Sequence, residues 1–324
     1  MNYDELKQRM LKVSGATEGQ VDKFLRYCDA LMSNPQTDFN APETVEKLIR
    51  LDEQRLSVSA YQRRKSWAII FYEKLCDENL VKPIIVRYVR YHDIQQTDMS
   101  DMLQTYYFSG LDDVLNYIGL LAESNGFDAE GGLLFYKSAA ILIWTIGQHN
   151  IKPILDVRKS DLCVDPYGVL IDGKFFRLSE RAWRILDTFA GSDTYLPYAS
   201  KRYFELKESA YLLRSSRSEK ISYNALACAF RDLNNADERV RGGKKLAMDC
   251  LVNNGGFERV YQRVQRGEEF YVSMIAEEIS TTRAMASCYR NLYEQWCQRY
   301  KGMNIRDWRL SYGRSVELHH VKRS

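Results

Sequence analysis

"WTIGQHNIKPILDVRKSDL", residues 144–162, is the stretch that decides the fold. An apolar run ends at Gly147 and a short polar turn follows. A second helix is expected to start with Pro153, because proline suits the first turn of a helix. The basic and acidic residues at 158–161 then lead into a strand. This order predicts that a helical chain changes into a sheet here.

The segments on either side of this stretch extend the same pattern. "EGGLLFYKSAAILIWTIG", residues 130–147, is apolar on most sides, which predicts a central helix. "DLCVDPYGVLIDGKFFRLS", residues 161–179, has β-rich runs, and its Asp172-Gly173 pair is a strong hairpin-turn signal. We expect an antiparallel sheet of about three strands near residues 160–178. Ser179 is expected to cap the next helix.

The N-terminal part of the chain reads as helices. "YDELKQRMLKV", "EGQVDKFLRYCDALM" and "SVSAYQRRKSWAIIFYEKLCDEN" place apolar residues three and four positions apart. "HDIQQTDMSD", residues 92–101, reads as a linker. The predicted fold class is therefore mainly α with a small antiparallel β-sheet, in two domains. Residues 1–96 form a helical domain, and residues 97–324 form a second domain that carries the sheet and a C-terminal helical tail.

Composition excludes several classes of protein. With 324 residues, 45% of them hydrophobic and 27% charged, the chain fits a soluble globular protein of about two domains. No apolar stretch is long enough for a membrane span, and the N-terminus lacks the apolar core of a signal peptide. The seven cysteines are scattered without CxxC spacing, which indicates reduced thiols and a cytoplasmic protein. We expect no metal and no cofactor. The net charge of +3 decides nothing about a nucleic-acid partner.

The order of these segments resembles the catalytic domain of the tyrosine recombinases, the phage integrase family. The matching segments are "ILIWTIG", "QHNIKPIL", "DVRKSDL", "VLIDGKFFRLS" and "ERAWRILDTF", and "YLLRSSRSEKISYNAL" follows further on. "SAYQRRKSWAIIFYEKLCDEN" is similar to a helix of that family's core-binding domain. The resemblance covers most of the chain but lies mainly in the order of elements. It implies a helical core-binding-like domain followed by an integrase catalytic-like domain.

In that family a tyrosine attacks a DNA phosphate, two arginines bind the phosphate oxygens, and a lysine and histidines move protons. The residues at the corresponding positions here depart from that set. They are Asn150 for the first arginine, Lys174 for the lysine, Arg241 and Lys244 for the His-x-x-Arg pair, and Met285 for the tyrosine. Lys152 and Arg158 are close in sequence to Asn150, but they would occupy different positions from the arginine. The single literal His-x-x-Arg, His320 to Arg323, lies at the C-terminus and is interpreted as accidental. The resemblance thus implies a scaffold without catalysis.

Double-stranded DNA is the predicted partner. Basic clusters fall where the resembling scaffold meets DNA, and such clusters neutralise phosphates. The candidate DNA contacts are these basic residues and one neighbouring glutamine: Gln62, Arg63, Arg64, Lys65, Lys174, Lys201, Arg202, Arg214, Arg217, Lys220, Arg239, Arg241, Lys244 and Lys245. Gln62, Arg63, Asn224 and Arg231 are also candidates for reading base edges. A solvated surface of mixed charge is the alternative for each cluster.

Three functions remain open from the sequence. The favoured one is a non-catalytic, sequence-specific DNA-binding protein, a phage transcriptional repressor that maintains lysogeny. In length and in its eroded active site the chain resembles the recombinase-like repressors of SPβ-type Bacillus phages. The second is an active recombinase with a displaced site that uses Tyr289 or Tyr293. The third is a helical protein-interaction module without DNA binding. The aromatic C-terminal segment, residues 289–324, is a candidate for forming a homo-oligomer, with intramolecular packing as the alternative.

Overall fold

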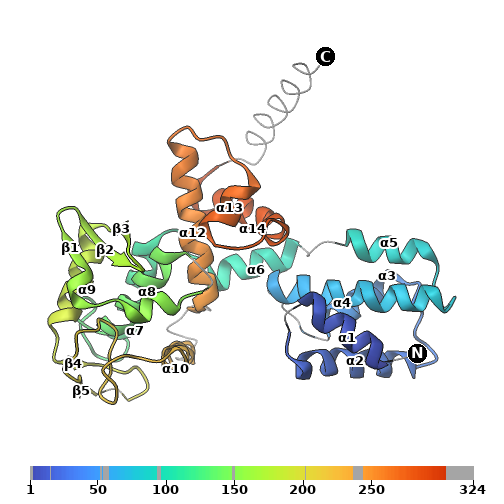
Figure 1. Cartoon of the computed structure of the whole chain (residues 1–324), viewed down its shortest axis with the longest axis horizontal. Coiled ribbons are helices and arrows are strands. Elements are labelled where there is room, and N and C mark those ends of the chain that lie inside the picture. Colours follow the sequence, from blue (N-terminus) through green and yellow to red (C-terminus); the bar gives the residue numbers. More distant parts are fainter. Residues whose placement is uncertain are drawn as a thin grey trace. The chain divides into compact units, whose positions relative to one another are not determined.

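The protein is described from a computed structural model that covers residues 3–14, 16–51, 53, 58–92, 96–147, 150–200, 202–235 and 244–303. The chain separates into two compact units (Figure 1), unit 1 with residues Met1–Met102 and unit 2 with residues Leu103–Ser324. The predicted fold class, mainly α with a small antiparallel sheet, is confirmed.

Unit 1 is built around the long helix α4. Its helices are α1 (Tyr3–Ser14), α2 (Glu18–Met32), α3 (Pro42–Arg50), α4 (Val58–Asp77) and α5 (Pro83–Tyr91). Helix α4 packs against α1, α3 and α5, and its Trp67 meets Phe24 of α2 with 5.3 Å between ring centroids. Pro42 and Pro83 each stand in the first turn of a helix, where the missing N–H has no intrahelical partner to lose.

The linker predicted over residues 92–101 is wrong in its second half. Helix α6 (Gln96–Tyr106) begins inside it and continues from unit 1 into unit 2. The segment contains neither proline nor glycine, and Met99, Met102 and Leu103 recur at helical spacing and are buried. Its polar residues suggested a linker, but burial of this apolar stripe supports a helix. The predicted domain boundary at residue 96 falls at the first residue of α6.

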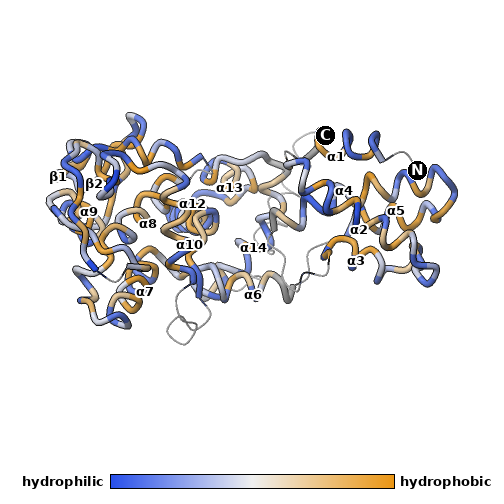
Figure 2. Tube along the Cα trace, turned by 90° about the horizontal axis from the view of Figure 1, so that it is seen from below, coloured by the Kyte–Doolittle hydropathy of each residue, from blue (hydrophilic) through white to orange (hydrophobic). Residues whose placement is uncertain are grey.

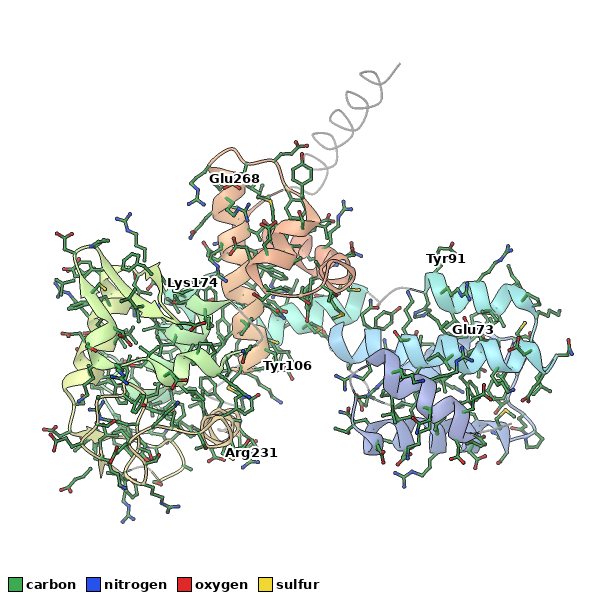
Figure 3. The ribbon with its side chains drawn as sticks, in the orientation of Figure 1. Glu73, Tyr91, Tyr106, Lys174, Arg231 and Glu268 are labelled. Carbon is green, nitrogen blue, oxygen red and sulfur yellow. The ribbon has the colours of Figure 1, made fainter. Side chains whose placement is uncertain are left out.

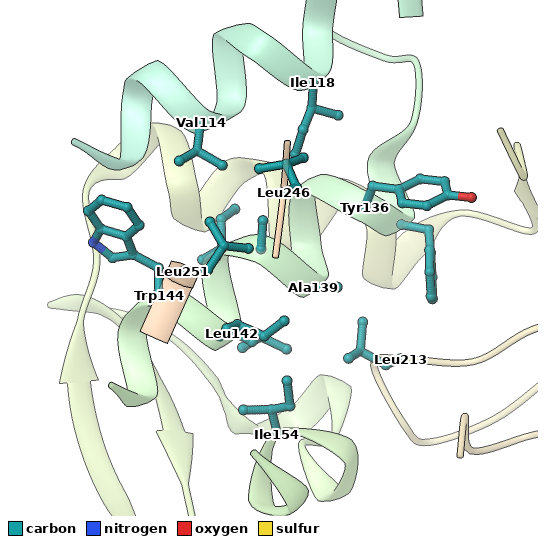
Figure 4. Packing of buried hydrophobic residues seen from close by; sticks show 14 of the residues in the cluster. Val114, Ile118, Tyr136, Ala139, Leu142, Trp144, Ile154, Leu213, Leu246 and Leu251 are labelled. Atoms are coloured by element: carbon teal, nitrogen blue, oxygen red, sulfur yellow. The ribbon is translucent and has the colours of Figure 1, made fainter. Parts of the chain in front are cut away.

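Unit 2 is organised around α8 (Leu134–Ile146), in which every residue from Phe135 to Ile146 is buried. Figure 4 shows this core with α8 residues at its centre, and the hydropathy colouring in Figure 2 marks the same helix as hydrophobic. Its neighbours are α7, α9 and α12. The other helices of unit 2 are α7 (Leu111–Glu123), α9 (Glu180–Gly191), α10 (Tyr223–Asn234), α12 (Met248–Gln265), α13 (Val272–Glu278) and α14 (Arg283–Lys301).

The predicted sheet is confirmed. Strands β1 (Leu162–Val164), β2 (Tyr167–Ile171) and β3 (Lys174–Arg177) are antiparallel in the order β1-β2-β3. Asp172 and Gly173 join β2 to β3 with φ values of 51° and 71°, so both central residues of the turn are left-handed, as a type I′ hairpin requires. Ser179 caps α9 through its side chain, as predicted. A two-stranded ribbon of β4 (Thr194–Tyr195) and β5 (Phe204–Glu205) was not predicted.

The helix predicted to start with Pro153 is a single 3-10 turn, η1 (Lys152–Asp156), followed by a second short turn, η2 (Lys159–Asp161). Ile154 and Leu155 are buried by this turn. The backbone is extended at Val157 and Arg158, and Arg158 forms an isolated bridge with Tyr211. Pairing with another segment therefore ends the helical turn after five residues. The predicted C-terminal helical tail is present as α14, and residues 304–324 lie outside the described part of the chain.

Candidate nucleic-acid interface

Asn150, which the sequence resemblance assigns to the first arginine position, follows the C-terminal end of α8. The helix ends at Gly147 in a left-handed conformation, with φ of 57°. Asn150 is exposed, and its side-chain oxygen accepts a hydrogen bond from the backbone N–H of Lys152 at 3.3 Å. The side chain therefore caps its own turn and carries no positive charge toward a phosphate.

The structure brings Asn150 together with the β2–β3 hairpin around a cavity of about 360 Å³. The lining residues are Asn150, Lys152, Pro153, Asp156, Val157, Asp161, Leu170 and Asp172. Three of them are aspartates and one is a lysine. Asp161 accepts a hydrogen bond from the backbone N–H of Arg158 at 2.7 Å, and Asp156 forms an ion pair with Lys220. A phosphodiester in this cavity would face more carboxylates than cations, which disfavours its binding.

Arg259 of α12 lies beside the same end of α8, and the sequence reading did not single it out. Its guanidinium donates to the carbonyl oxygens of Trp144 and Thr145 at 3.0 and 3.1 Å, and to the Glu278 carboxylate at 2.8 Å. A Cβ atom on Gly147 would lie 1.4 Å from Arg259 Nη2, so only glycine leaves room for this guanidinium. Desolvation lowers the Arg259 pKa from its ordinary value. This arginine satisfies terminal carbonyls of α8 and is committed to the protein.

The requirement for glycine at position 147 points to Arg259, but this signal is visible only once the fold is known. In sequence, Arg259 sits in "GFERVYQRVQRG", which reads as an ordinary helix with a solvated basic face. Its partners, Trp144 and Glu278, are far away in the chain. No local spacing signals such a contact.

Met285, which the resemblance assigns to the tyrosine position, and the two candidate nucleophiles Tyr289 and Tyr293 all lie on α14. Met285 stands in the first turn of α14, where its backbone N–H donates to the Thr282 side chain at 3.3 Å. Tyr289 is 5% exposed, and burial raises its pKa to about 12. Tyr293 is fully buried, with its ring stacked on Phe270 and Trp296. A tyrosine nucleophile has to reach the phosphate and lose its proton, and burial opposes both steps.

In unit 1, all three predicted basic contacts donate hydrogen bonds within the unit. Arg64 donates to the carbonyl oxygen of Arg50 and to the Glu53 carboxylate, both at 2.6 Å. Lys65 donates to the carbonyl oxygen of His92. Arg63 is partly exposed and donates to the Gln20 side chain at 3.0 Å. Gln62, on the same turn of α4, is partly exposed.

In unit 2, Arg214 is 2% exposed despite its position in a polar segment. Its guanidinium donates to the carbonyl oxygens of Ser192 at 2.6 Å and Ala190 at 3.3 Å, and lies 5.5 Å from the Phe189 ring centroid. These contacts hold the C-terminal end of α9. Desolvation lowers the Arg214 pKa.

Lys244 is also enclosed by the protein. Its ammonium donates to the carbonyl oxygen of Tyr107 and to the Tyr300 hydroxyl, and lies 4.6 Å from the Phe108 ring centroid. Burial lowers its pKa to about 8. The neighbouring Lys245 donates its backbone N–H to Thr105, and its side chain is partly exposed. Adjacent lysines therefore have different surroundings.

Besides Lys245, the described part of unit 2 has four predicted cations that reach the surface: Lys174, Arg202, Arg217 and Lys220. Lys174 starts β3 next to the hairpin turn (Figure 3). Arg202 covers the Phe204 ring at 4.8 Å, and the Lys220 ammonium lies 5.4 Å from the Tyr211 ring. Arg158 lies near the same Tyr211 ring, at 5.8 Å. Predicted contacts Lys201, Arg239 and Arg241, together with His320 and Arg323, lie outside the described residues.

Helix α10 presents a polar face. Leu226, Phe230 and Leu233 are buried on one side of it. Asn224 and Arg231 are exposed and two turns apart, so they lie on the same opposite face, and Arg231 is labelled in Figure 3. Their spacing of about 10 Å along the axis corresponds to about three base pairs. The helix has the residue types that bind guanine and adenine edges.

The described residues contain neither a candidate metal site nor a candidate membrane-spanning helix. Among them, no group of three or more His, Cys, Asp and Glu side chains could hold a metal ion. None of the described helices is long and apolar enough to cross a membrane.

Comparisons with known proteins give a likeness of fold. No family model and no curated protein matches the chain. The solved structures with a similar fold include lambda integrase (residues 75–356) bound to DNA, with 12% identity, a TM-score of 0.44, and 94% of this chain and 100% of that chain covered. A lambda integrase (75–356) dimer bound to a COC′ core site has 12% identity, a TM-score of 0.42, and coverages of 89% and 94%. XerA recombinase has 13% identity, a TM-score of 0.39, and coverages of 94% and 100%. Values this low carry no argument about activity or ligands.

Proposed function

We propose that this chain binds double-stranded DNA at specific sequences without cutting it, and that it acts as a transcriptional repressor that maintains the lysogeny of a phage. The observation that carries the proposal is the surroundings of Asn150. Where the resembling family places an arginine for phosphate, the chain has a neutral amide beside Asp156, Asp161 and Asp172.

Several positions support the absence of cleavage together. Arg259 is the cation nearest in the fold to the end of α8 among those described above, and it is bound to Trp144, Thr145 and Glu278. Tyr289 and Tyr293 are buried. Loss of one phosphate-binding group typically costs several kcal/mol of transition-state stabilisation, about 3–4 kcal/mol. A protein that lacks the phosphate-binding arginine and whose tyrosines are buried can bind DNA but is not expected to cut it at a useful rate.

Exposed cations support DNA binding. Lys174, Arg202, Arg217 and Lys220 of unit 2 and Arg63 of unit 1 keep their charged groups at or near the surface. Phosphate contacts from such residues supply affinity, while Asn224 and Arg231 on α10 offer a face for base readout. A protein that grips an operator and leaves it intact can block transcription, which is the basis for the repressor role.

Two experiments test the proposal. A gel shift with fragments of phage and host genome at about 150 mM salt should retard some fragments far more than others. A suicide substrate, nicked next to the selected site, should give no covalent protein–DNA adduct. Equal retardation of all fragments contradicts specific recognition, and a covalent adduct contradicts the absence of catalysis. No retardation at all would favour a protein-interaction module.

The regulatory role needs a separate measurement. In a lysogen that carries the gene, depletion of the protein should raise transcription of genes next to its bound sites and start phage production. Arg231→Ala should have the same effect if α10 reads the operator. Unchanged transcription after depletion would contradict a repressor even if DNA binding is specific.

A further inference from the structure

Unit 2 contains a second, larger cavity of about 730 Å³ that lies between the turn at 128–131, the start of α8, and α9. Its lining residues are Asp128, Ala129, Glu130, Gly131, Leu134, Lys137, Glu180, Arg181, Arg184, Ile185 and Thr188. None of them is a predicted DNA contact. The volume is in the range of sites that bind small organic molecules.

Lys137 forms the buried end of this cavity. The residue is 3% exposed, and its ammonium donates to the carbonyl oxygens of Ala129 and Glu130, the second at 2.8 Å. Both acceptors are neutral. Among the described residues no carboxylate forms an ion pair with this ammonium. The charges of Asp128 and Glu130 act on it from a distance and raise its pKa, whereas the positive charge of Arg181 lowers it. Lys137 is thus a nearly buried cation without a bound anion, which is a costly arrangement.

The turn at 128–131 explains why its own carboxylates form no direct ion pair with Lys137. The Asp128 carboxylate accepts the backbone N–H of Gly131, so it is used within the turn. A Cβ atom on Gly132 would lie 2.4 Å from the Asp128 carbonyl oxygen and 2.8 Å from the Ala122 side chain. The turn is therefore pressed against α7. In this position its carbonyl groups, rather than its carboxylates, face the ammonium.

The other walls combine apolar surface with charged groups of both signs. Leu134 and Ile185 line the cavity from α8 and α9. Arg181 is fixed by Asp112 at 3.0 Å and Asn116 at 2.7 Å, so its charge has a defined place. Arg184, with a side chain that is 70% exposed, forms an ion pair with Glu180 at 2.5 Å. An anion would find Lys137 at the buried end, and on the α9 side Arg181 and Arg184, each of which already pairs with a carboxylate.

We infer that this cavity is a binding site for a small molecule with one carboxylate and an apolar tail. The carboxylate would accept a hydrogen bond from the Lys137 ammonium and supply its missing negative charge. The tail would cover Leu134 and Ile185 and remove apolar surface from water. The site is independent of the proposed DNA binding, because it shares no residue with the predicted interface.

Calorimetric titration of the full chain with hexanoate and with hexanamide tests the inference. The two probes have similar size and tail but differ in charge. Because a hydrogen bond between charged groups is stronger than one to a neutral acceptor, we expect the hexanoate dissociation constant to be about tenfold lower at pH 7. Equal constants, or no heat from either probe at tens of millimolar, would overturn the inference.

Two variants keep the test independent of folding. Lys137→Met preserves the length of the side chain without its charge and should remove the preference for hexanoate. Arg184→Glu changes an exposed residue. It should raise the dissociation constant of hexanoate by about threefold and leave that of hexanamide unchanged. Unfolding curves of both variants show whether they are folded. A preference for hexanoate that survives in folded Lys137→Met would also contradict the proposed site.

A pH series gives a further readout. Burial lowers the Lys137 pKa to about 8, so hexanoate should bind more weakly as pH rises from 7 to 9. The other charged groups at the cavity are Asp128, Glu130, Glu180, Arg181 and Arg184. Carboxylates and guanidinium groups do not ordinarily titrate in this interval. Binding that does not change with pH would show that Lys137 does not hold the carboxylate.

Discussion

Two regions of unit 2 use their cations in opposite ways. At the end of α8, Arg259 donates to the backbone carbonyls of Trp144, Thr145 and Glu278 and to the carboxylate of Glu278. In the polar segment before α10, Arg217 is exposed. Its backbone N–H donates to the Ser215 hydroxyl, and its guanidinium forms no ion pair with a carboxylate of the described residues. The first arginine holds helices together and the second can meet a phosphate. The difference teaches that the contacts of a basic residue, rather than its presence in a basic cluster, decide whether it can bind DNA.

Replacement of Arg259 should have the largest effect. Arg259→Ala removes a donor from the Trp144 and Thr145 carbonyls and leaves the Glu278 carboxylate with Arg263 as its remaining cation. We expect a loss of about 2–4 kcal/mol in the free energy of unfolding. Denaturant unfolding measures it. Arg184→Ala removes an exposed pair with Glu180 and should cost less than about 0.5 kcal/mol. Similar losses for the two variants would contradict the structural role of Arg259.

The sequence predicted the elements better than it predicted the site. The β2–β3 hairpin followed from Asp172-Gly173, and the central helix followed from the apolar run that ends at Gly147, because both signals are local. Helix α6 was missed because its few apolar residues stand among polar ones, and only burial shows that they pack.

The site residues depend on distant partners. Arg214 and Arg217 are three residues apart in one polar segment, yet the first is buried against α9 and the second is exposed. Arg64 and Lys244 were predicted to bind DNA and are used inside their units. No pattern within a short stretch distinguishes these cases, since the partner of each cation comes from elsewhere in the chain.

The adjacent residues Lys244 and Lys245 repeat the contrast between a cation used within the protein and one at the surface, with smaller expected effects. Lys244→Ala removes an ammonium and an aliphatic chain packed near Phe108 and Tyr300, and should lower the free energy of unfolding by about 1–2 kcal/mol. Lys245→Ala should leave stability within about 0.5 kcal/mol of the wild type. If Lys245 contacts a phosphate, its replacement should weaken DNA binding equally on all sequences. A stability loss for Lys245 larger than that for Lys244 would reverse their assigned roles.

Replacement of the exposed Arg217 should affect DNA binding and leave the stability of the fold unchanged. We expect Arg217→Ala to weaken DNA binding by about threefold to tenfold, and to reduce the slope of log affinity against log salt by about 0.9, the value for one lost phosphate contact. Fluorescence anisotropy at several salt concentrations measures both quantities. Arg266, whose side chain is 68% exposed at the end of α12, supplies a control of the same chemistry. An unchanged slope for Arg217→Ala would place the interface on another face.

The smallest expected effect is a dependence of stability on pH. Burial lowers the Lys244 pKa from 10.5 to about 8 in the folded protein. Between these values the unfolded chain binds more protons at this site than the folded chain, so Lys244 favours folding increasingly as pH rises above 8. We expect the difference in unfolding free energy between wild type and Lys244→Met to shift toward the wild type between pH 7 and 9.5.

That interval is chosen because of Tyr300, which contacts Lys244 and whose pKa is raised by burial. A phenol with a raised pKa favours the unfolded state once the free phenol ionises, near pH 10, which would oppose the lysine. Comparison with Lys244→Met at each pH also cancels contributions that the two proteins share. A difference that stays constant from pH 7 to 9.5 would mean that the Lys244 ammonium is as well solvated in the folded protein as in the unfolded chain, and the contrast between enclosed and exposed cations would fail at this residue.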